Sequence, residues 1–235
     1  MPLARDFRKM GRDVLSGNWL LAVLVTLLAV LLGGAVYSGS FSIFCNIQEY
    51  YGNLHIVVAS MITVYQIVTF IIGSSVEIGI CSFYIKLQRR EDCGCNDLFA
   101  YFNIFGKALL LRLYIGLLIF AWSLLLIVPG IIAAYRYSMA TYLLSQNREL
   151  GVCQAVALSK KMMDGHKGRL FCLDISFIGW YLLACLTFGL GMLFLTPYVL
   201  SARAAFFLDL QYHYNLENGI YNQGTTAETS GAFCG

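Results

Sequence analysis

Long apolar runs alternate with short charged segments along this chain of 235 residues. The first run, 20–37, contains no charged residue, and its length approaches the roughly 20 residues that a helix needs to cross about 30 Å of hydrocarbon. Later runs range from 14 to 30 residues, and glycine or proline interrupts some of them. The pattern predicts six transmembrane helices at 20–37, 56–85, 108–128, 131–144, 170–195 and 196–212.

The segments between these runs differ in their content of lysine and arginine. Basic residues gather at 1–18, 86–107 and 145–169, whereas 39–55 contains none. Because lysine and arginine favour the cytoplasmic side of a membrane, this distribution places both termini in the cytoplasm. The six helices then form three helical hairpins.

The polar segments complete the predicted organisation. Apolar residues at helical spacing make 1–18 an amphipathic helix expected on the membrane surface, and 152–163 a second surface helix. The six-span membrane domain covers 19–212, and the polar tail at 213–235 is expected to be disordered. A secretory signal peptide is the alternative interpretation of the N-terminus, but the long basic region and long apolar run favour a retained span.

Composition supports a membrane protein of the all-α class, a polytopic helical bundle. Hydrophobic residues make up 59% of the chain and charged residues 12%, with a mean hydropathy of +0.70. Soluble domains carry about 25% charged residues and need them to cover their surface. These values exclude a soluble enzyme, a disordered chain and a nucleic-acid-binding protein. The expected partner is the lipid bilayer with its anionic lipids.

One ionisable residue lies deep inside each of the three predicted returning helices. Glu77, Arg136 and Arg203 each precede the cytoplasmic end of their helix by eight or nine residues, which corresponds to about 12–14 Å. Ionisable groups at such depth usually face the interior of a bundle and are candidates for function. We expect this cluster to bind an anionic group or to form part of a polar path. The alternative is structural: Glu77 pairs with an arginine, or the arginines reach the headgroups.

A second group of charges follows a predicted helix stop at Gly165. His166, Lys167 and Arg169 could bind a lipid phosphate, because clustered cations at the inner leaflet attract anionic headgroups. Asp174 lies about one turn into the next span and is expected to pair with a basic residue of this loop. The alternative interpretation is an ordinary basic cytoplasmic loop.

No catalytic or metal-binding pattern stands out. The chain lacks a P-loop, a dinucleotide-binding fingerprint, a nucleophile elbow and a zinc-protease helix. Cys93 and Cys95 have no second pair or nearby histidine that would complete a zinc site. We therefore expect a protein that is not an enzyme and that holds no metal or cofactor.

Three motifs resemble a known family. They are LLLIVPGII at 124–132, GHK at 165–167 and SFIGW at 176–180. Over about 15–212 the chain is similar to a bacterial integral-membrane family catalogued as domain of unknown function 975, found largely in Gram-positive bacteria. The resemblance implies a polytopic protein of the bacterial plasma membrane and brings no activity or residue roles. Glu77 departs from the neutral residue that the resemblance leads us to expect.

Two functions are consistent with these observations. The first is transport, or the binding of a lipid or other anionic ligand, through the central polar cluster. The second is a structural or accessory subunit that binds another membrane protein, a peptide or a second copy of itself. A cavity lined by the cluster would favour the first function, and a dry, packed interior would favour the second.

Overall fold

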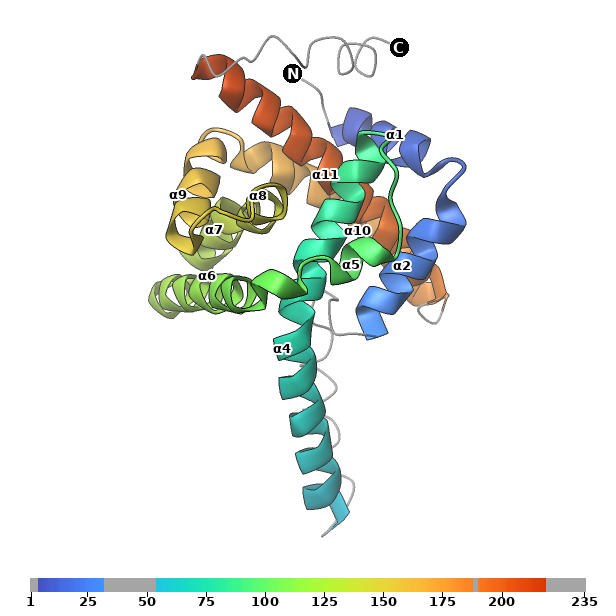
Figure 1. Ribbon diagram of the computed structural model, residues 1–235, viewed down its shortest axis with the longest axis vertical. Helices are drawn as coiled ribbons and strands as arrows, with labels where there is room; N and C mark the ends of the chain where they lie inside the picture. Colours follow the sequence, from blue (N-terminus) through green and yellow to red (C-terminus); the bar gives the residue numbers. More distant parts are fainter. Residues whose placement is uncertain (1–3, 32–53, 188–189, 219–235) are drawn as a thin grey trace.

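The computed structural model describes residues 4–31, 54–187 and 190–218, and within these ranges the chain is helical without a strand (Figure 1). The predicted loop at 39–53, the end of the first predicted span and most of the predicted tail lie outside the described residues. The helices are α1 Ala4–Leu15, α2 Trp19–Leu31, α4 Leu54–Gln88, α5 Asn96–Phe99, α6 Phe105–Leu125, α7 Ile127–Tyr137, α8 Ala140–Gln146, α9 Val152–Met162, α10 Lys167–Leu186 and α11 Leu190–Glu217, with a 3-10 turn at Phe102–Ile104.

Four helical segments are long and apolar enough to cross a membrane. A fifth span results if α1 and α2, whose axes bend by 101°, are counted as one. Gly17 allows this bend, because its φ of 104° lies in the left-handed region that glycine adopts without strain. The all-helical class is confirmed, and the six-span count stays a prediction. The four segments are Thr63–Gln88, Asn96–Leu125, Lys167–Leu186 and Gly191–Glu217.

The turn between the last two predicted spans lies earlier in the chain than expected. The helix α10 ends at Leu186 and α11 begins at Leu190, so Pro197 lies inside α11 instead of at the turn. Gly191 permits the turn: a Cβ at this position would lie 2.8 Å from Cα of Ala184. Membrane helices tolerate an internal proline because neighbouring groups can satisfy the freed backbone. The helix α11 also continues to Glu217, so the first residues of the predicted polar tail are helical.

The break between α6 and α7 is a single extended residue. Leu126 has φ −164° and ψ 147°, and α7 begins directly after it. Pro129, where the sequence predicts the break, lies in the first turn of α7, a position where proline fits a helix. Gly130 allows α6 and α7 to pack closely, because a Cβ at this position would overlap Ser123.

The predicted fourth span, 131–144, is divided between α7 and α8. The division falls at Ser138 and Met139. The Ser138 hydroxyl donates to the carbonyl of Tyr135 at 2.8 Å, a side-chain bond that competes with the helical backbone and often bends it.

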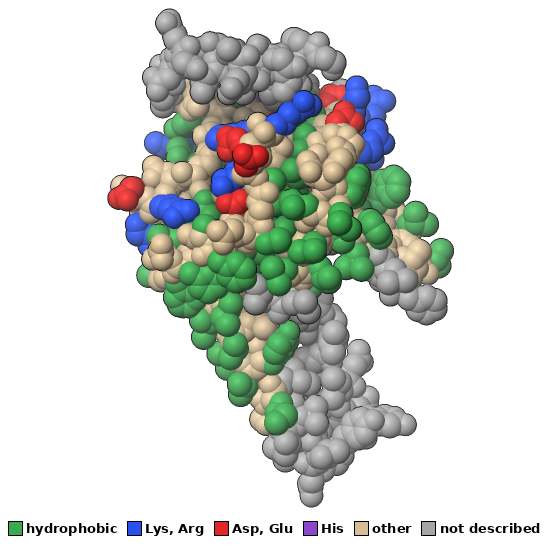
Figure 2. All heavy atoms as spheres, turned by 45° about the vertical axis from the view of Figure 1, so that its right-hand side comes forward, with side chains coloured by type: hydrophobic (Ala, Val, Ile, Leu, Met, Phe, Trp, Pro, Cys, Tyr) green, Lys and Arg blue, Asp and Glu red, His purple; other side chains and the backbone are tan. Residues whose placement is uncertain are grey.

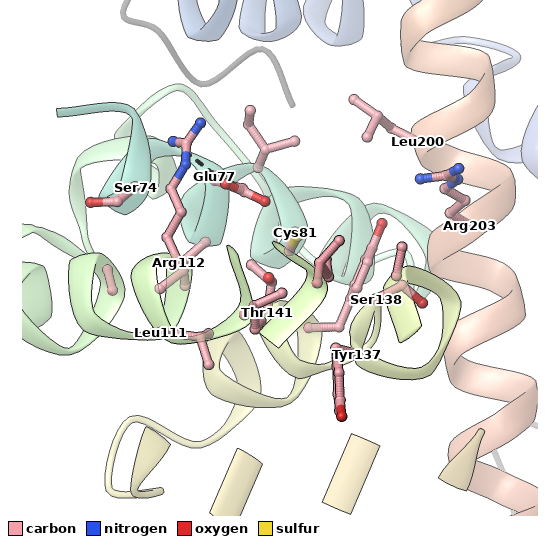
Figure 3. Close-up of a pocket in the computed structure, with 17 residues that line it drawn as sticks. Ser74, Glu77, Cys81, Leu111, Arg112, Tyr137, Ser138, Thr141, Leu200 and Arg203 are labelled. Carbon is pink, nitrogen blue, oxygen red and sulfur yellow. Dashed lines mark ion pairs between the residues drawn. The ribbon is translucent and has the colours of Figure 1, made fainter. Parts of the chain in front are cut away.

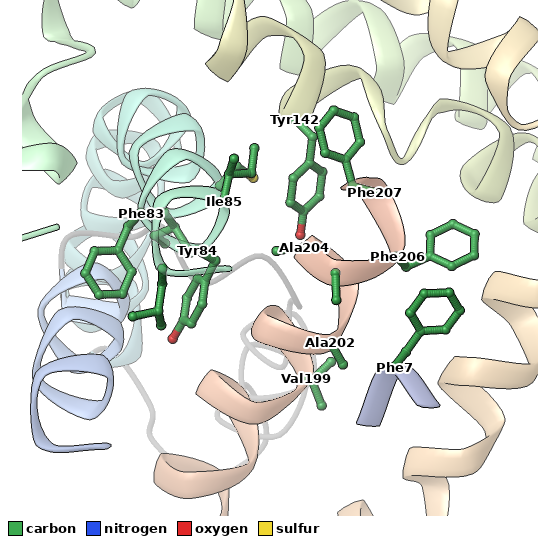
Figure 4. Close-up of a cluster of buried hydrophobic side chains, with 14 of the residues drawn as sticks. Phe7, Phe83, Tyr84, Ile85, Tyr142, Val199, Ala202, Ala204, Phe206 and Phe207 are labelled. Atoms are coloured by element: carbon green, nitrogen blue, oxygen red, sulfur yellow. The ribbon is translucent and has the colours of Figure 1, made fainter. Parts of the chain in front are cut away.

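The amphipathic helix α1 packs against protein. Its residues Phe7, Gly11 and Leu15 are buried on one face. Phe7 meets the ring of Phe206 at 5.3 Å (Figure 4), and a Cβ on Gly11 would lie 3.0 Å from the backbone nitrogen of Ala202. The sequence predicts that this face lies on lipid, whereas in the structure it covers α11. The two helices run antiparallel, because later residues of α1 contact earlier residues of α11.

Charged and apolar side chains occupy different parts of the surface. Figure 2 shows the charged side chains gathered towards the end that carries α1, with apolar side chains prominent over the described part of the face below them. An exposed apolar surface of this extent is typical of a protein embedded in lipid. Large exposed apolar residues lie on α4 (Met61, Val64, Tyr65, Ile67, Val68), on α6 (Leu110, Leu113, Leu117, Phe120) and on α10 (Ile175, Ile178, Trp180, Leu182, Leu183).

Candidate functional site

A cavity of about 240 Å³ lies where α4, α6, the α7–α8 pair and α11 meet (Figure 3). Most of its 17 lining residues are apolar, and three are charged: Glu77 of α4, Arg112 of α6 and Arg203 of α11. Hydroxyl groups of Ser138 and Thr141 belong to the same lining. We call this space the central cavity. Two of the three predicted cluster residues, Glu77 and Arg203, therefore line one space.

Glu77 and Arg112 form a loose ion pair. Oε2 of Glu77 lies 3.7 Å from Nη1 of Arg112, which is too long for a hydrogen bond. The side chains are 20% and 26% exposed, and Nη1 of Arg112 is buried without a hydrogen-bond partner in the described part of the chain. The guanidinium also lies over the ring of Phe70, 4.6 Å from its centroid. The two charges compensate each other while hydrogen-bonding capacity remains on both.

Arg203 has a close partner on the neighbouring helix. Its Nη2 lies 2.8 Å from both carboxylate oxygens of Asp174 on α10, and its Nε lies 3.2 Å from Oδ1. Figure 3 shows the side chain of Arg203 approaching the central cavity from α11. The prediction that Asp174 pairs with a basic loop residue is wrong, since the partner comes from a different helix. Asp174 itself lies outside the lining of the cavity.

Arg136 does not belong to the lining of the central cavity. It lies in the last turn of α7, and its backbone carbonyl accepts a hydrogen bond from Ser159 of α9 at 3.0 Å. The expectation of equal depth assumed continuous returning helices that end near 85, 144 and 212. The kink at Ser138 interrupts the second helix and α11 extends beyond the third end, so the three positions are not equivalent.

The predicted headgroup site is divided among separate ion pairs. Nζ of Lys167 lies 3.3 Å from Asp164, and Nη2 of Arg169 lies 2.6 Å from Oδ2 of Asp209. The guanidinium of Arg169 also lies over the rings of Phe7 and Phe206, at 5.6 and 5.5 Å from their centroids. Arg169 therefore joins α10 to α1 and α11 inside the protein.

His166 lies beside this packing, just before α10. Its ring centroid is 6.5 Å from that of His213, and His213 in turn lies 3.6 Å from Asp209. The pKa of His166 is lowered below its ordinary value of 6.5, mainly because the ring is partly buried and secondly because the positive charge of Arg169 is near. A neutral imidazole at this position adds no charge that would attract a lipid phosphate.

Comparison with protein-family models gives one match, to the family described as "Protein of unknown function (DUF975)", over residues 1–133 and 123–213. The chain belongs to the DUF975 family. No curated protein and no solved structure matches the chain. The family description names no activity, so the function of this DUF975 protein has to be argued from its own residues.

Sequence reasoning did not include Arg112 among the site residues of this DUF975 protein. The sequence places Arg112 near the start of the third predicted span, where we expect it to reach towards the headgroups. The structure directs it to Glu77 instead. The sequence does mark Arg112 as a candidate, because it is an ionisable residue within an apolar helix. Glu77 and Arg203 are selected by the same criterion. Its partner could not be known without the packing of α6 on α4.

Proposed function

We propose that this DUF975 protein is a non-enzymatic integral membrane protein that binds an anionic group in the central cavity, and that it serves in transport or lipid binding. The anionic group belongs to a small molecule or to a lipid headgroup. The observation that carries the proposal is the presence of two guanidinium groups, Arg112 and Arg203, in the lining of one cavity between apolar helices. Guanidinium groups suit carboxylate and phosphate because they present several donors in a fixed plane.

The lining supports binding more than it supports simple packing. A buried polar atom normally has a hydrogen-bond partner, and Nη1 of Arg112 has none in the described ranges. The 3.7 Å separation from Glu77 leaves this donor available to a ligand. Thr141 would add a hydroxyl group beside a bound anion, whereas the hydroxyl of Ser138 already donates to the carbonyl of Tyr135.

The proposed orientation places six spans in a bacterial plasma membrane, with both termini in the cytoplasm. The concentration of charged side chains at the end that carries α1 supports this orientation, since cytoplasmic segments carry an excess of lysine and arginine (Figure 2). In this arrangement α7 and α8 together provide the fourth span as a kinked helix. Anionic lipids of the inner leaflet are the expected neighbours of the basic end.

Ligand-dependent stabilisation of the purified protein in lipid nanodiscs tests the proposed function. The probes are phosphatidylglycerol as a lipid anion and inorganic phosphate as a free anion. We expect Arg112→Gln and Arg203→Gln to weaken binding by about tenfold or more, which corresponds to the loss of roughly one charge-assisted contact. Arg5→Gln on the exposed side of α1 is the matched control and should leave binding unchanged.

Arg112→Lys separates a binding defect from a folding defect, because it keeps the positive charge and replaces the planar guanidinium by a smaller ammonium group. It should retain more anion binding than Arg112→Gln at equal thermal stability. If neither glutamine variant changes binding of any probe while both variants stay folded, the central cavity is not the site. That result would favour the alternative of a structural or accessory subunit.

A further inference from the structure

The central cavity contains an acid that a simple anion would not satisfy. Glu77 is part of the lining, and no hydrogen bond reaches its carboxylate from the described residues, where Arg112 at 3.7 Å is its ion-pair partner. Two carboxylate oxygens enclosed in a largely apolar space require strong donors. An anion placed beside Glu77 would instead face a like charge in a medium of low dielectric constant.

Within the described ranges, each charged residue of the lining has an ion-pair partner of opposite sign. The charge of Glu77 compensates the charge of Arg112. Asp174, which is not part of the lining, compensates the charge of Arg203 through its contacts at 2.8 Å. A ligand with a net negative charge would disturb this balance. A ligand of zero net charge that carries separated positive and negative groups would preserve it and would provide partners of both signs.

Glu77 and Arg203 lie on different sides of the cavity, and Arg112 lies beside Glu77. Figure 3 shows Glu77 and Arg112 together on one side of the cavity, while Arg203 approaches from α11 on another side. Ser138 and Thr141 lie between them, and apolar side chains such as Leu111 and Leu200 complete the wall.

We infer that the occupant of the central cavity is a zwitterion whose primary ammonium group donates to Glu77 and whose anionic group accepts from Arg203. This inference rests on the proposed function of the cavity as a binding site. An ammonium group with N–H donors fits better than a quaternary amine, because the carboxylate of Glu77 needs hydrogen-bond donors and a quaternary amine has none. Two sources share this chemistry: the headgroup of an ethanolamine phospholipid, and a free amino acid or phosphoethanolamine.

Competition among lipids in nanodiscs distinguishes these ligands. The full-length protein is placed in nanodiscs that contain equal amounts of phosphatidylethanolamine, phosphatidylglycerol and phosphatidylcholine, and retained lipid is identified by native mass spectrometry. We expect retention of phosphatidylethanolamine to exceed that of the other two by about tenfold, or soluble phosphoethanolamine to displace bound lipid. The first result identifies a lipid occupant, and displacement identifies a free zwitterion.

Three variants connect the selectivity to Glu77. Glu77→Gln keeps the shape of the side chain and removes its charge, so it should abolish the preference for the ammonium group and raise retention of phosphatidylglycerol. Glu77→Asp keeps the charge and should keep the preference, which separates selectivity from folding. Glu149→Gln, on an exposed loop residue, is the control.

Equal retention of phosphatidylglycerol and phosphatidylethanolamine by the unmodified protein, unaffected by Glu77→Gln but weakened by Arg203→Gln, would overturn the zwitterion and leave the proposed function intact. Retention that no cavity variant changes would overturn both.

Discussion

The guanidinium of Arg203 donates to the carboxylate of Asp174 through two hydrogen bonds of 2.8 Å and one of 3.2 Å, and this pair joins α10 to α11. A second pair, Arg169 with Asp209, joins the same helices at 2.6 Å with the charges exchanged between them. Because the base is on α10 in one pair and on α11 in the other, a displacement of α11 by about one and a half turns would bring like charges together. The two pairs therefore specify one register for these helices.

Removing one partner of the Asp174 pair should destabilise the protein. We expect Asp174→Asn to lower the free energy of unfolding by about 1–3 kcal/mol, since a polar contact between membrane helices is worth less than a fully buried pair in a soluble protein. Denaturation of the detergent-solubilised protein measures the change. The double variant Asp174→Arg, Arg203→Asp should recover part of the loss. Asp164→Asn, whose carboxylate is largely exposed, serves as the control, and a loss equal to that of Asp174→Asn would contradict the argument.

A methyl group at Gly79 should disrupt the contact between α4 and α5. A Cβ there would lie 2.7 Å from the backbone carbonyl oxygen of Leu98, which cannot move like a flexible side chain. We expect Gly79→Ala to cost about 1–3 kcal/mol of stability, the usual range for overpacking. Gly116→Ala on α6 is the matched control, because nothing lies within 4 Å of its Cβ position and alanine favours a helix. Equal melting temperatures of the two variants would show that α5 can move away from α4 without a loss of stability.

Acidification should destabilise the protein through His166. Its pKa is lowered in the folded state, so between that pKa and 6.5 the unfolded chain binds more protons than the folded chain. The free energy of unfolding therefore falls as the pH decreases through this window. We expect His166→Gln to show a smaller decrease in melting temperature than the unmodified protein between about pH 7.5 and 5.5. An identical decrease in both proteins would show that the acid sensitivity comes from other groups.

Labelling of Cys153 tests the proposed orientation. This thiol is exposed on α9, within the segment that we place in the cytoplasm. In a variant that retains Cys153 as its single cysteine, a membrane-impermeant maleimide should react only after the cells are opened. Cys81 is buried and provides the negative control as a single-cysteine variant. Labelling of Cys153 in intact cells would reverse the orientation.

The sequence was sufficient for the helical class because long apolar runs dominate it, but the ends of several helices depend on contacts between distant residues. The turn after Leu186 requires the close approach of Gly191 to Ala184, and the break at Leu126 accompanies the closure of Gly130 on Ser123. The sequence predicts these breaks at Pro197 and Pro129, but both prolines lie within helices.

The residues of the candidate site were also only partly predictable from the sequence. Glu77 and Arg203 are recognisable as charges inside apolar helices, and both line the central cavity. Arg136 satisfies the same criterion but lies elsewhere, because the helix that carries it bends at Ser138. The choice of Asp174 as the partner of Arg203 depends on the register of two helices, which residue spacing alone does not determine.

The position of α1 has a consequence for the order of assembly during synthesis. The hydroxyl of Ser201 donates to the carbonyl of Gly11, which joins residues 190 positions apart, and Gln88 of α4 donates to the same serine. Because α1 precedes α11 in the chain, the apolar face of α1 is covered by α11 only after α11 has been synthesised. Until α11 emerges, Phe7 and Leu15 remain available to chaperones, proteases and lipid. A chain truncated before α11 would leave α1 without its main packing partner.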